Sequence, residues 1–120
     1  MNTLNWFEIP CQDLDRAVRF YEAVTGKQLK RESFFGTPHG IFPRDGEASV
    51  TGALIQNQLR PSVDGTVIYL DAAGHLDAWL ARVADAGGRV LLPRTSIGEM
   101  GAIAQLQDTE GNRIGLHQRA

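Results

Sequence analysis

Residues 13–26 of the chain, DLDRAVRFYEAVTG, decide the fold of its first half. Asp13 carries a carboxylate that can accept hydrogen bonds from the exposed N–H groups of a first helical turn. Gly26 can adopt the left-handed conformation that ends a helix without penalty. Between them the apolar residues recur at helical spacing and form one stripe, which consists of Ala17, Phe20, Tyr21 and Val24. The pattern predicts a helix over 13–25.

The segments on either side of this helix favour strands. Residues 3–11 (TLNWFEIPC) are moderately apolar and rich in large side chains, which predicts a strand before the helix. The residues after it are divided by glycine and proline, which predicts turns between short strands. These strands are expected near 28–35, 38–43 and 49–56, followed by a polar linker over 57–64.

The same order of elements is expected again in the second half. Residues 65–71 (GTVIYLD) favour a strand, and a second helix begins at His75-Leu76-Asp77 and closes at Gly87-Gly88. Its apolar stripe comprises Leu76, Trp79, Leu80 and Val83. Strands are expected at 89–92, 101–107 and 112–118, the last two joined by a hairpin turn over 108–112 (DTEGN).

An offset of 62 residues places the first helix on the second. It places Leu14 on Leu76, Gly26 on Gly88 and Leu29 on Leu91. We therefore predict an α+β fold of two tandem βαβββ modules, about 1–57 and 64–120, in one domain of 120 residues.

The composition excludes several classes of partner. Hydrophobic residues make up 42% of the chain and the net charge is −2, so neither disorder nor a basic surface for nucleic acid or anionic membrane is expected. No stretch approaches the roughly 20 apolar residues of a membrane span, and the first ten residues lack a leader pattern. Cys11 is the only cysteine, which is typical of a reducing compartment, and we expect a cytoplasmic protein.

Four stretches resemble the vicinal oxygen chelate superfamily, which includes glyoxalase I, extradiol dioxygenases, fosfomycin-resistance enzymes and bleomycin-binding proteins. They are WFEIP (6–10), DLDRAVRFYEAVTG (13–26), AGGRVLLP (86–93) and DTEGNRIGL (108–116). The first and third are most similar to lactoylglutathione-lyase-related proteins of unassigned activity. The resemblance implies that the modules curve into a half-open sheet around a concave pocket, and that two chains form a homodimer, in some members with a shared pocket.

Metal-dependent members of this family hold a divalent ion with His or Glu side chains from four strands. Carried over to this chain, the first position falls on Trp6, the third on Thr66 and the fourth on Gly115, while residues 49–56 offer no carboxylate, imidazole or thiol for the second. Neither an indole nor a glycine hydrogen coordinates a metal. We therefore expect no metal and no other cofactor.

Alternation along the strands places several side chains on the concave face. Trp6 and Glu8 share one face of the first strand, opposite Phe7, Ile9 and Cys11, which are expected to pack against the helix. Trp6 would either stack a planar ligand or pack in a core or dimer interface. Glu8, if partly desolvated, would suit a proton-transfer base, although an ion pair with an arginine, in the same chain or across a dimer, is the alternative.

The remaining candidates are weaker. His117 shares the face of Gly115 and would either bind ligand or be solvated, and His39 and His75 are expected to be solvated. Cys11 is expected to be an inert packed thiol. Met100 lies in a glycine-flanked segment, 95–101, that would form an adaptable lip of the pocket. The candidate pocket residues are Trp6, Glu8, Thr66, Ile68, Met100, Gly115 and His117.

Three functions remain open from the sequence. We favour a metal-independent protein of this family that binds a small, partly apolar or aromatic molecule, with Glu8 as the catalytic base if it has chemistry. The alternatives are a metal-dependent lyase, isomerase or dioxygenase with an unusual ligand set such as Glu8 and His117, and an interaction module whose concave face is filled by its own side chains.

Overall fold

The first half of the chain forms a four-stranded mixed sheet with one helix. A computed structural model describes residues 3–46 and 49–120. Its first five elements are β1 (Trp6–Pro10), α1 (Leu14–Thr25), β2 (Lys30–Phe34), β3 (Thr37–Ile41) and β4 (Thr51–Ile55). The strand order is β1-β4-β3-β2, with β1 and β4 parallel and the other pairs antiparallel. We call this sheet the N-sheet.

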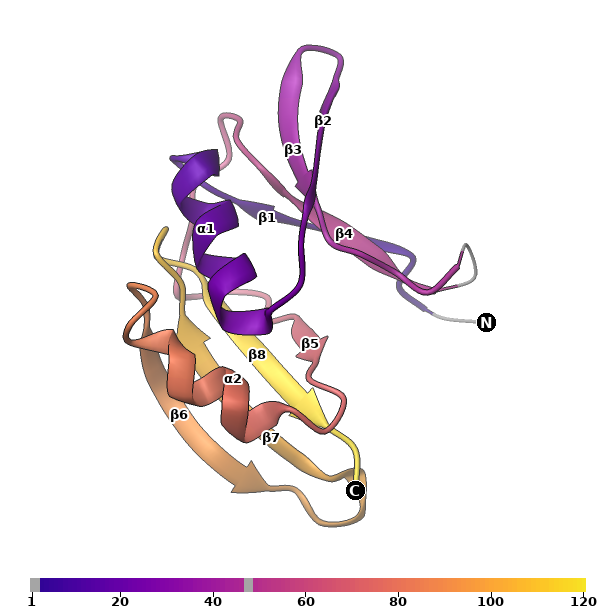
Figure 1. Ribbon diagram of the computed structural model, residues 1–120, viewed down its shortest axis with the longest axis vertical. Coiled ribbons are helices and arrows are strands. Elements are labelled where there is room, and N and C mark those ends of the chain that lie inside the picture. The colour runs from indigo at the N-terminus through magenta and orange to yellow at the C-terminus, as the bar shows by residue number, and fades with distance from the viewer. Residues whose placement is uncertain (1–2, 47–48) are drawn as a thin grey trace.

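The second half repeats this topology. Its elements are β5 (Tyr69–Asp71), α2 (Leu76–Val83), β6 (Arg89–Ser96), a 3₁₀ turn η1 (Gly98–Met100), β7 (Ala102–Gln107) and β8 (Arg113–Gln118). The strand order β5-β8-β7-β6 matches that of the first half, again with the first pair parallel. We call this sheet the C-sheet. The predicted α+β fold of two βαβββ units is confirmed, and the two sheets do not close into a barrel (Figure 1).

The ends of α1 confirm the local signals in the sequence. The carboxylate of Asp13 accepts a hydrogen bond from the backbone N–H of Arg16, and Gly26 takes a left-handed φ of 70° at the other end. The predicted stripe is buried, and Ile9 and Cys11 of β1 pack against it. His75, by contrast, precedes α2 without a side-chain capping bond.

Two strands differ most from their predicted bounds. The strand expected over 65–71 is regular only over Tyr69–Asp71, because the backbone pairs with β8 from Tyr69 onward. β6 extends well beyond the expected 89–92, to Ser96, with register shifts against β7 that accommodate Pro93. The segment expected to form a lip therefore begins inside a strand and continues as η1.

The two helices contact each other, and one apolar core joins the two halves. α1 and α2 contact each other, and buried residues from both sheets belong to one cluster with them. Figure 1 shows α1 and α2 together on one side of the two sheets. Each sheet thus has a helix-covered face and a second face turned away from the helices, which we call its open face.

The turn between β7 and β8 fastens the second half to the first. Glu110 in this turn accepts hydrogen bonds from the backbone N–H groups of Gln12 and Asp13 and from the guanidinium of Arg16, at 2.7–3.0 Å. Asp108 accepts from the hydroxyl of Tyr21 at 2.7 Å. These polar groups cross between segments almost a hundred residues apart, so the relative position of the two sheets is defined by directional bonds as well as by the core.

No helix of the described residues is long and apolar enough to cross a membrane.

Candidate functional site

The open face of the C-sheet carries several polar side chains. The pairing of the strands places Tyr69, Asp71, Gln105, Arg113, Gly115 and His117 on this face. A hollow of about 470 Å³ opens at one end of it and is lined by Tyr69, Asp71, Glu99, Met100, His117, Arg119 and Ala120. We call this the C-sheet hollow.

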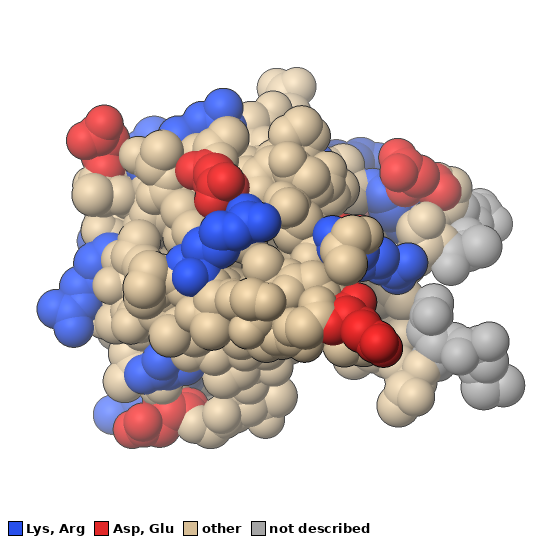
Figure 2. Space-filling view, turned by 90° about the horizontal axis from the view of Figure 1, so that it is seen from below, with Lys and Arg blue, Asp and Glu red and all other residues tan. Residues whose placement is uncertain are grey.

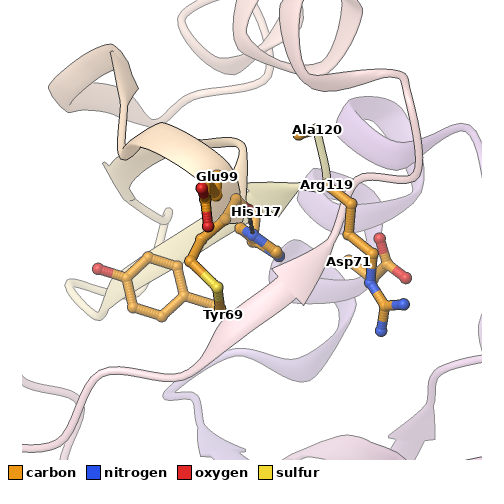
Figure 3. Close-up of a pocket in the computed structure, with 7 residues that line it drawn as sticks. Tyr69, Asp71, Glu99, His117, Arg119 and Ala120 are labelled. Carbon is orange, nitrogen blue, oxygen red and sulfur yellow. Dashed lines mark hydrogen bonds between the residues drawn. The ribbon is translucent and has the colours of Figure 1, made fainter.

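The imidazole of His117 lies at the centre of the C-sheet hollow. Figure 3 shows it between the ring of Tyr69 on one side and the side chains of Asp71 and Arg119 on the other. Its Nε2 donates to the carbonyl oxygen of Met100 at 2.7 Å. Because a carbonyl oxygen only accepts, this bond assigns the proton to Nε2 and leaves Nδ1 of the neutral ring as an acceptor. The same bond holds η1 against the sheet.

The open face of the N-sheet has its own, more apolar hollow. It measures about 380 Å³ and includes Trp6, Phe34, Ile41 and Phe42 together with the cations Lys30 and Arg44. Trp6 is 39% exposed and Phe34 is 43% exposed, so two aromatic side chains remain accessible there. The hollow suits contact with a planar or apolar group.

A third and larger cleft separates the two sheets. It measures about 760 Å³, and its walls include Phe7 and Phe42 from the first half and Ile68 and Trp79 from the second. Thr66 and Ile68 belong to this cleft and not to the C-sheet hollow. The candidate pocket residues are therefore distributed over three concavities within a single chain.

The structure separates the candidate residues into two groups. Trp6 and Glu8 lie on the N-sheet, whereas Met100, Gly115 and His117 lie on or beside the C-sheet. Trp6 and His117 line different hollows. The cleft between the sheets touches both hollows, because its walls include Phe42 of the N-sheet hollow and Tyr69 of the C-sheet hollow.

Glu8 differs from its expected environment. The side chain is exposed, so the prediction of a partly desolvated carboxylate is wrong for the single chain. Within the described residues of the single chain Glu8 forms no ion pair with an arginine, and its partner is the indole N–H of Trp6 at 3.3 Å. An ion pair across a dimer stays a prediction. The bond orients the indole and the carboxylate beside each other on the open face.

The structure also shows the surroundings of His39, His75 and Cys11. His39 was expected in solvent but is only 7% exposed, because its Nδ1 donates to the carbonyl of Thr37 and the ring of Phe34 packs on it edge-to-face. His75 is exposed, as expected. Burial, reinforced by the carboxylates of Glu110 and Asp108, raises the pKa of the Cys11 thiol to about 12, so it stays protonated and inert.

The positions that hold a metal in related enzymes do not fit a metal here. Trp6 is paired with Thr51 on β4, and neither presents an imidazole or carboxylate. Cys11 and Ala72 make equivalent backbone bonds to Ile55 and His117, so the counterpart of Trp6 in the second half is Val67, one residue beyond Thr66. Neither of these side chains is a metal ligand of the usual kind.

The fourth position is blocked by a neighbouring ring. A Cβ placed on Gly115 would lie 2.3 Å from the ring of Tyr69, so that ring occupies the space a glutamate side chain would need. Among the described residues no group of three or more His, Cys, Asp or Glu side chains is arranged to hold an ion. The side chains at these positions are thus apolar or carry only a hydroxyl group.

Sequence reasoning missed three residues on the C-sheet. Tyr69, Gln105 and Arg113 form a hydrogen-bonded row across β5, β7 and β8. Each appears in the sequence as an ordinary strand residue, and only the register between three strands brings them together. The alternation along β7 does indicate a polar face, because Gln105 and Gln107 lie on the same face as Arg113.

The charge on the surface is mixed. Figure 2 shows basic and acidic side chains interspersed around a broad uncharged area on the face seen from below, without a continuous patch of either sign. That face offers no electrostatic footprint for a polyanion.

The sequence identifies the chain as a member of a known superfamily. The sequence profile of the Glyoxalase/Bleomycin resistance protein/Dioxygenase superfamily matches residues 3–116, and the chain belongs to that family. No curated protein matches the chain.

Solved structures share the fold at low sequence identity. A glyoxalase/bleomycin resistance protein from Albidiferax ferrireducens T118 is 18% identical with a TM-score of 0.79, covering 99% of this chain and 100% of that one. A glyoxalase-related enzyme from Fulvimarina pelagi is 13% identical with a TM-score of 0.72, covering 99% and 89%. A glyoxalase I mutant from Zea mays is 17% identical with a TM-score of 0.69, covering 96% of this chain but 46% of that chain.

Proposed function

We propose that this chain binds a small, partly apolar or aromatic molecule on its open sheet faces without the aid of a metal ion. The observation that carries the proposal is the ring of Tyr69 packed over Gly115, where a related metal enzyme has a carboxylate ligand. The ring replaces a cation-binding group by a flat apolar surface. Binding is then expected to rest on aromatic contact and hydrogen bonds.

The two hollows supply complementary chemistry for such a ligand. The N-sheet hollow offers the accessible aromatic rings of Trp6 and Phe34, and the C-sheet hollow offers His117 with a free Nδ1 acceptor and the thioether of Met100. Met100 is 68% exposed, and its flexible side chain can adapt to ligands of different shape.

The proposal includes a second copy of the chain. Each hollow is shallow on its own, and Trp6 and His117 do not share one. A symmetric dimer that places the N-sheet open face of one protomer against the C-sheet open face of its partner would form two identical, deeper pockets. The exposed apolar side chains on these faces, Trp6, Phe34, Tyr69 and Met100, would then be covered.

A thermal-shift screen tests the binding function. Aromatic antibiotics and thiol adducts are added to the purified protein, because a ligand that binds only the native state raises the melting temperature. We expect hits among planar compounds, with shifts reduced by Trp6→Ala and retained by Leu59→Ala. Leu59 is also exposed but lies in the linker. A screen without hits, together with a dimer whose cavity is filled by its own side chains, would favour an interaction module instead.

A further inference from the structure

A row of hydrogen-bond donors crosses the open face of the C-sheet. Nη1 of Arg113 donates to Oε1 of Gln105 at 2.9 Å, and Nε2 of Gln105 donates to the hydroxyl oxygen of Tyr69 at 2.7 Å. The amide of Gln105 is thereby fixed in orientation, since its carbonyl faces the guanidinium and its NH₂ faces the phenol.

The direction of these bonds leaves donors available at both ends of the row. The hydroxyl of Tyr69 accepts from Gln105, so its own O–H is available to donate, and among the hydrogen bonds of the described residues it donates to none. The guanidinium of Arg113 uses Nε for the carbonyl of Val63 and Nη1 for Gln105. A guanidinium has five N–H donors, so N–H groups of Arg113 also remain.

Arg113 is a half-buried cation that has no carboxylate partner among the described residues. The four ion pairs formed within residues 3–46 and 49–120 involve other arginines and a lysine. Its neighbours on this face, Gln105, Gln107 and Gly115, are uncharged. Charged side chains that are removed from solvent are normally paired, so the surroundings of Arg113 are suited to an anion that residues 3–46 and 49–120 do not supply.

We infer that the Tyr69–Gln105–Arg113 row is a subsite for the anionic oxygen of the ligand, such as a carboxylate on an aromatic or apolar body. The ring of Tyr69 supplies the surface on which the body lies, and its hydroxyl and the guanidinium of Arg113 bind the oxygen. The inference rests on the proposed function and names the chemical class of its ligand. In this chain three side chains would bind the ligand oxygen that a metal ion binds in related enzymes.

Two probes of the same shape test the subsite. Binding of naphthalene-2-carboxylate and naphthalene-2-carboxamide to the full-length protein is measured by isothermal titration calorimetry. We expect the wild-type protein to bind the carboxylate about tenfold more tightly than the amide, since hydrogen bonds to a charged group are the stronger ones. Tyr69→Phe keeps the ring over Gly115 and removes the hydroxyl, and Arg113→Gln removes the charge. Each is expected to reduce the preference for the carboxylate severalfold.

Matched controls separate the row from general effects of charge and folding. Arg60→Gln removes the same charge from an exposed linker position and should leave the preference unchanged. Gln105→Leu should reduce it, whereas Gln107→Leu, two residues along the same face of β7, should not. Because Arg113→Gln also removes the bond to Val63, Tyr69→Phe decides the result if that variant is poorly folded.

The outcomes distinguish the subsite from the wider proposal. Equal affinity for carboxylate and carboxamide in the wild-type protein, or an unchanged preference in Tyr69→Phe, would overturn the anion subsite and leave the binding function standing. Failure of the wild-type protein to bind either probe would overturn both.

Discussion

Glu110, in the turn between β7 and β8, accepts several of the hydrogen bonds that join the two halves of the molecule. Its side chain is fully buried beside Arg16, whose guanidinium lies 2.7 Å away. Burial alone would raise its pKa, but the bonds from Arg16, the backbone of Asp13 and Gln12 and the hydroxyl of Thr109 outweigh burial and lower the pKa to about 2. The folded state therefore favours the ionised form.

This pKa predicts how the stability depends on pH. Because the pKa is about 2 in the folded protein against an ordinary 4.5, the stabilisation is complete above about pH 4.5 and is lost as the pH falls towards 2. Urea unfolding followed by circular dichroism should show a free energy of unfolding that declines across this window. Glu110→Gln should lower it by about 3 kcal/mol at pH 7 and flatten the decline.

An exposed glutamate is the control for this prediction. Glu99→Gln removes the same charge from an accessible position and should change the stability by less than about 0.5 kcal/mol. A wild-type protein whose free energy of unfolding stays constant between about pH 5 and about pH 2.5 would contradict the role of Glu110.

The thiol of Cys11 gives a second prediction for a single residue. Cys11 is 1% exposed, and burial with nearby carboxylates raises its pKa to about 12. The native protein should therefore react with a disulfide reagent such as dithionitrobenzoate at pH 8 at least about a hundredfold more slowly than the urea-unfolded chain. Rapid stoichiometric reaction in the absence of urea would show that the thiol is accessible.

The contact between β5 and β8 predicts how substitutions in these two paired strands affect stability. A side chain at Gly115 of β8 would collide with the ring of Tyr69 of β5, so Gly115→Ala should destabilise the protein by about 1–3 kcal/mol. The penalty should largely disappear in a Tyr69→Ala background, because the obstacle is then absent. Urea unfolding of the two single variants and the double variant measures this coupling. Additive effects would mean that the ring does not lie over Gly115.

The elements that the sequence predicts best are those defined by local signals. The bounds of α1 follow from Asp13, Gly26 and the apolar stripe, all within one stretch of chain. The strand over 65–71 was predicted too long, because its regular part is set by pairing with β8, more than forty residues away. Likewise the burial of His39 arises from Phe34 across a hairpin, which the composition of a turn-rich segment does not indicate.

The arrangement of the site is a property of the whole molecule and was only partly predictable. Strand alternation correctly placed Trp6 with Glu8 and Gly115 with His117 on common faces. It did not show that Glu8 is exposed or that Trp6 and His117 line different hollows. The row from Tyr69 to Arg113 depends on the register of three strands at once, and no local pattern encodes that.

The proposed dimer gives a prediction for the assembled molecule. Sedimentation velocity should show a dimer at micromolar concentration, and Trp6→Glu should shift it towards monomer because it places a charge in the proposed interface. Leu59→Glu introduces the same charge at another exposed apolar residue, outside both open faces, and should leave the dimer intact. A wild-type monomer at these concentrations would require the ligand to bind to a single open face.

Metal content tests the central claim most directly. The protein is purified without chelators, exposed to nickel, zinc, manganese and iron in turn, dialysed, and analysed by inductively coupled plasma mass spectrometry. Since indole, hydroxyl and glycine stand where related enzymes have imidazole and carboxylate, we predict far less than one equivalent of any ion per chain and no rise in melting temperature. One equivalent of a transition metal, lost on replacing Glu8 or His117 by alanine, would contradict the account.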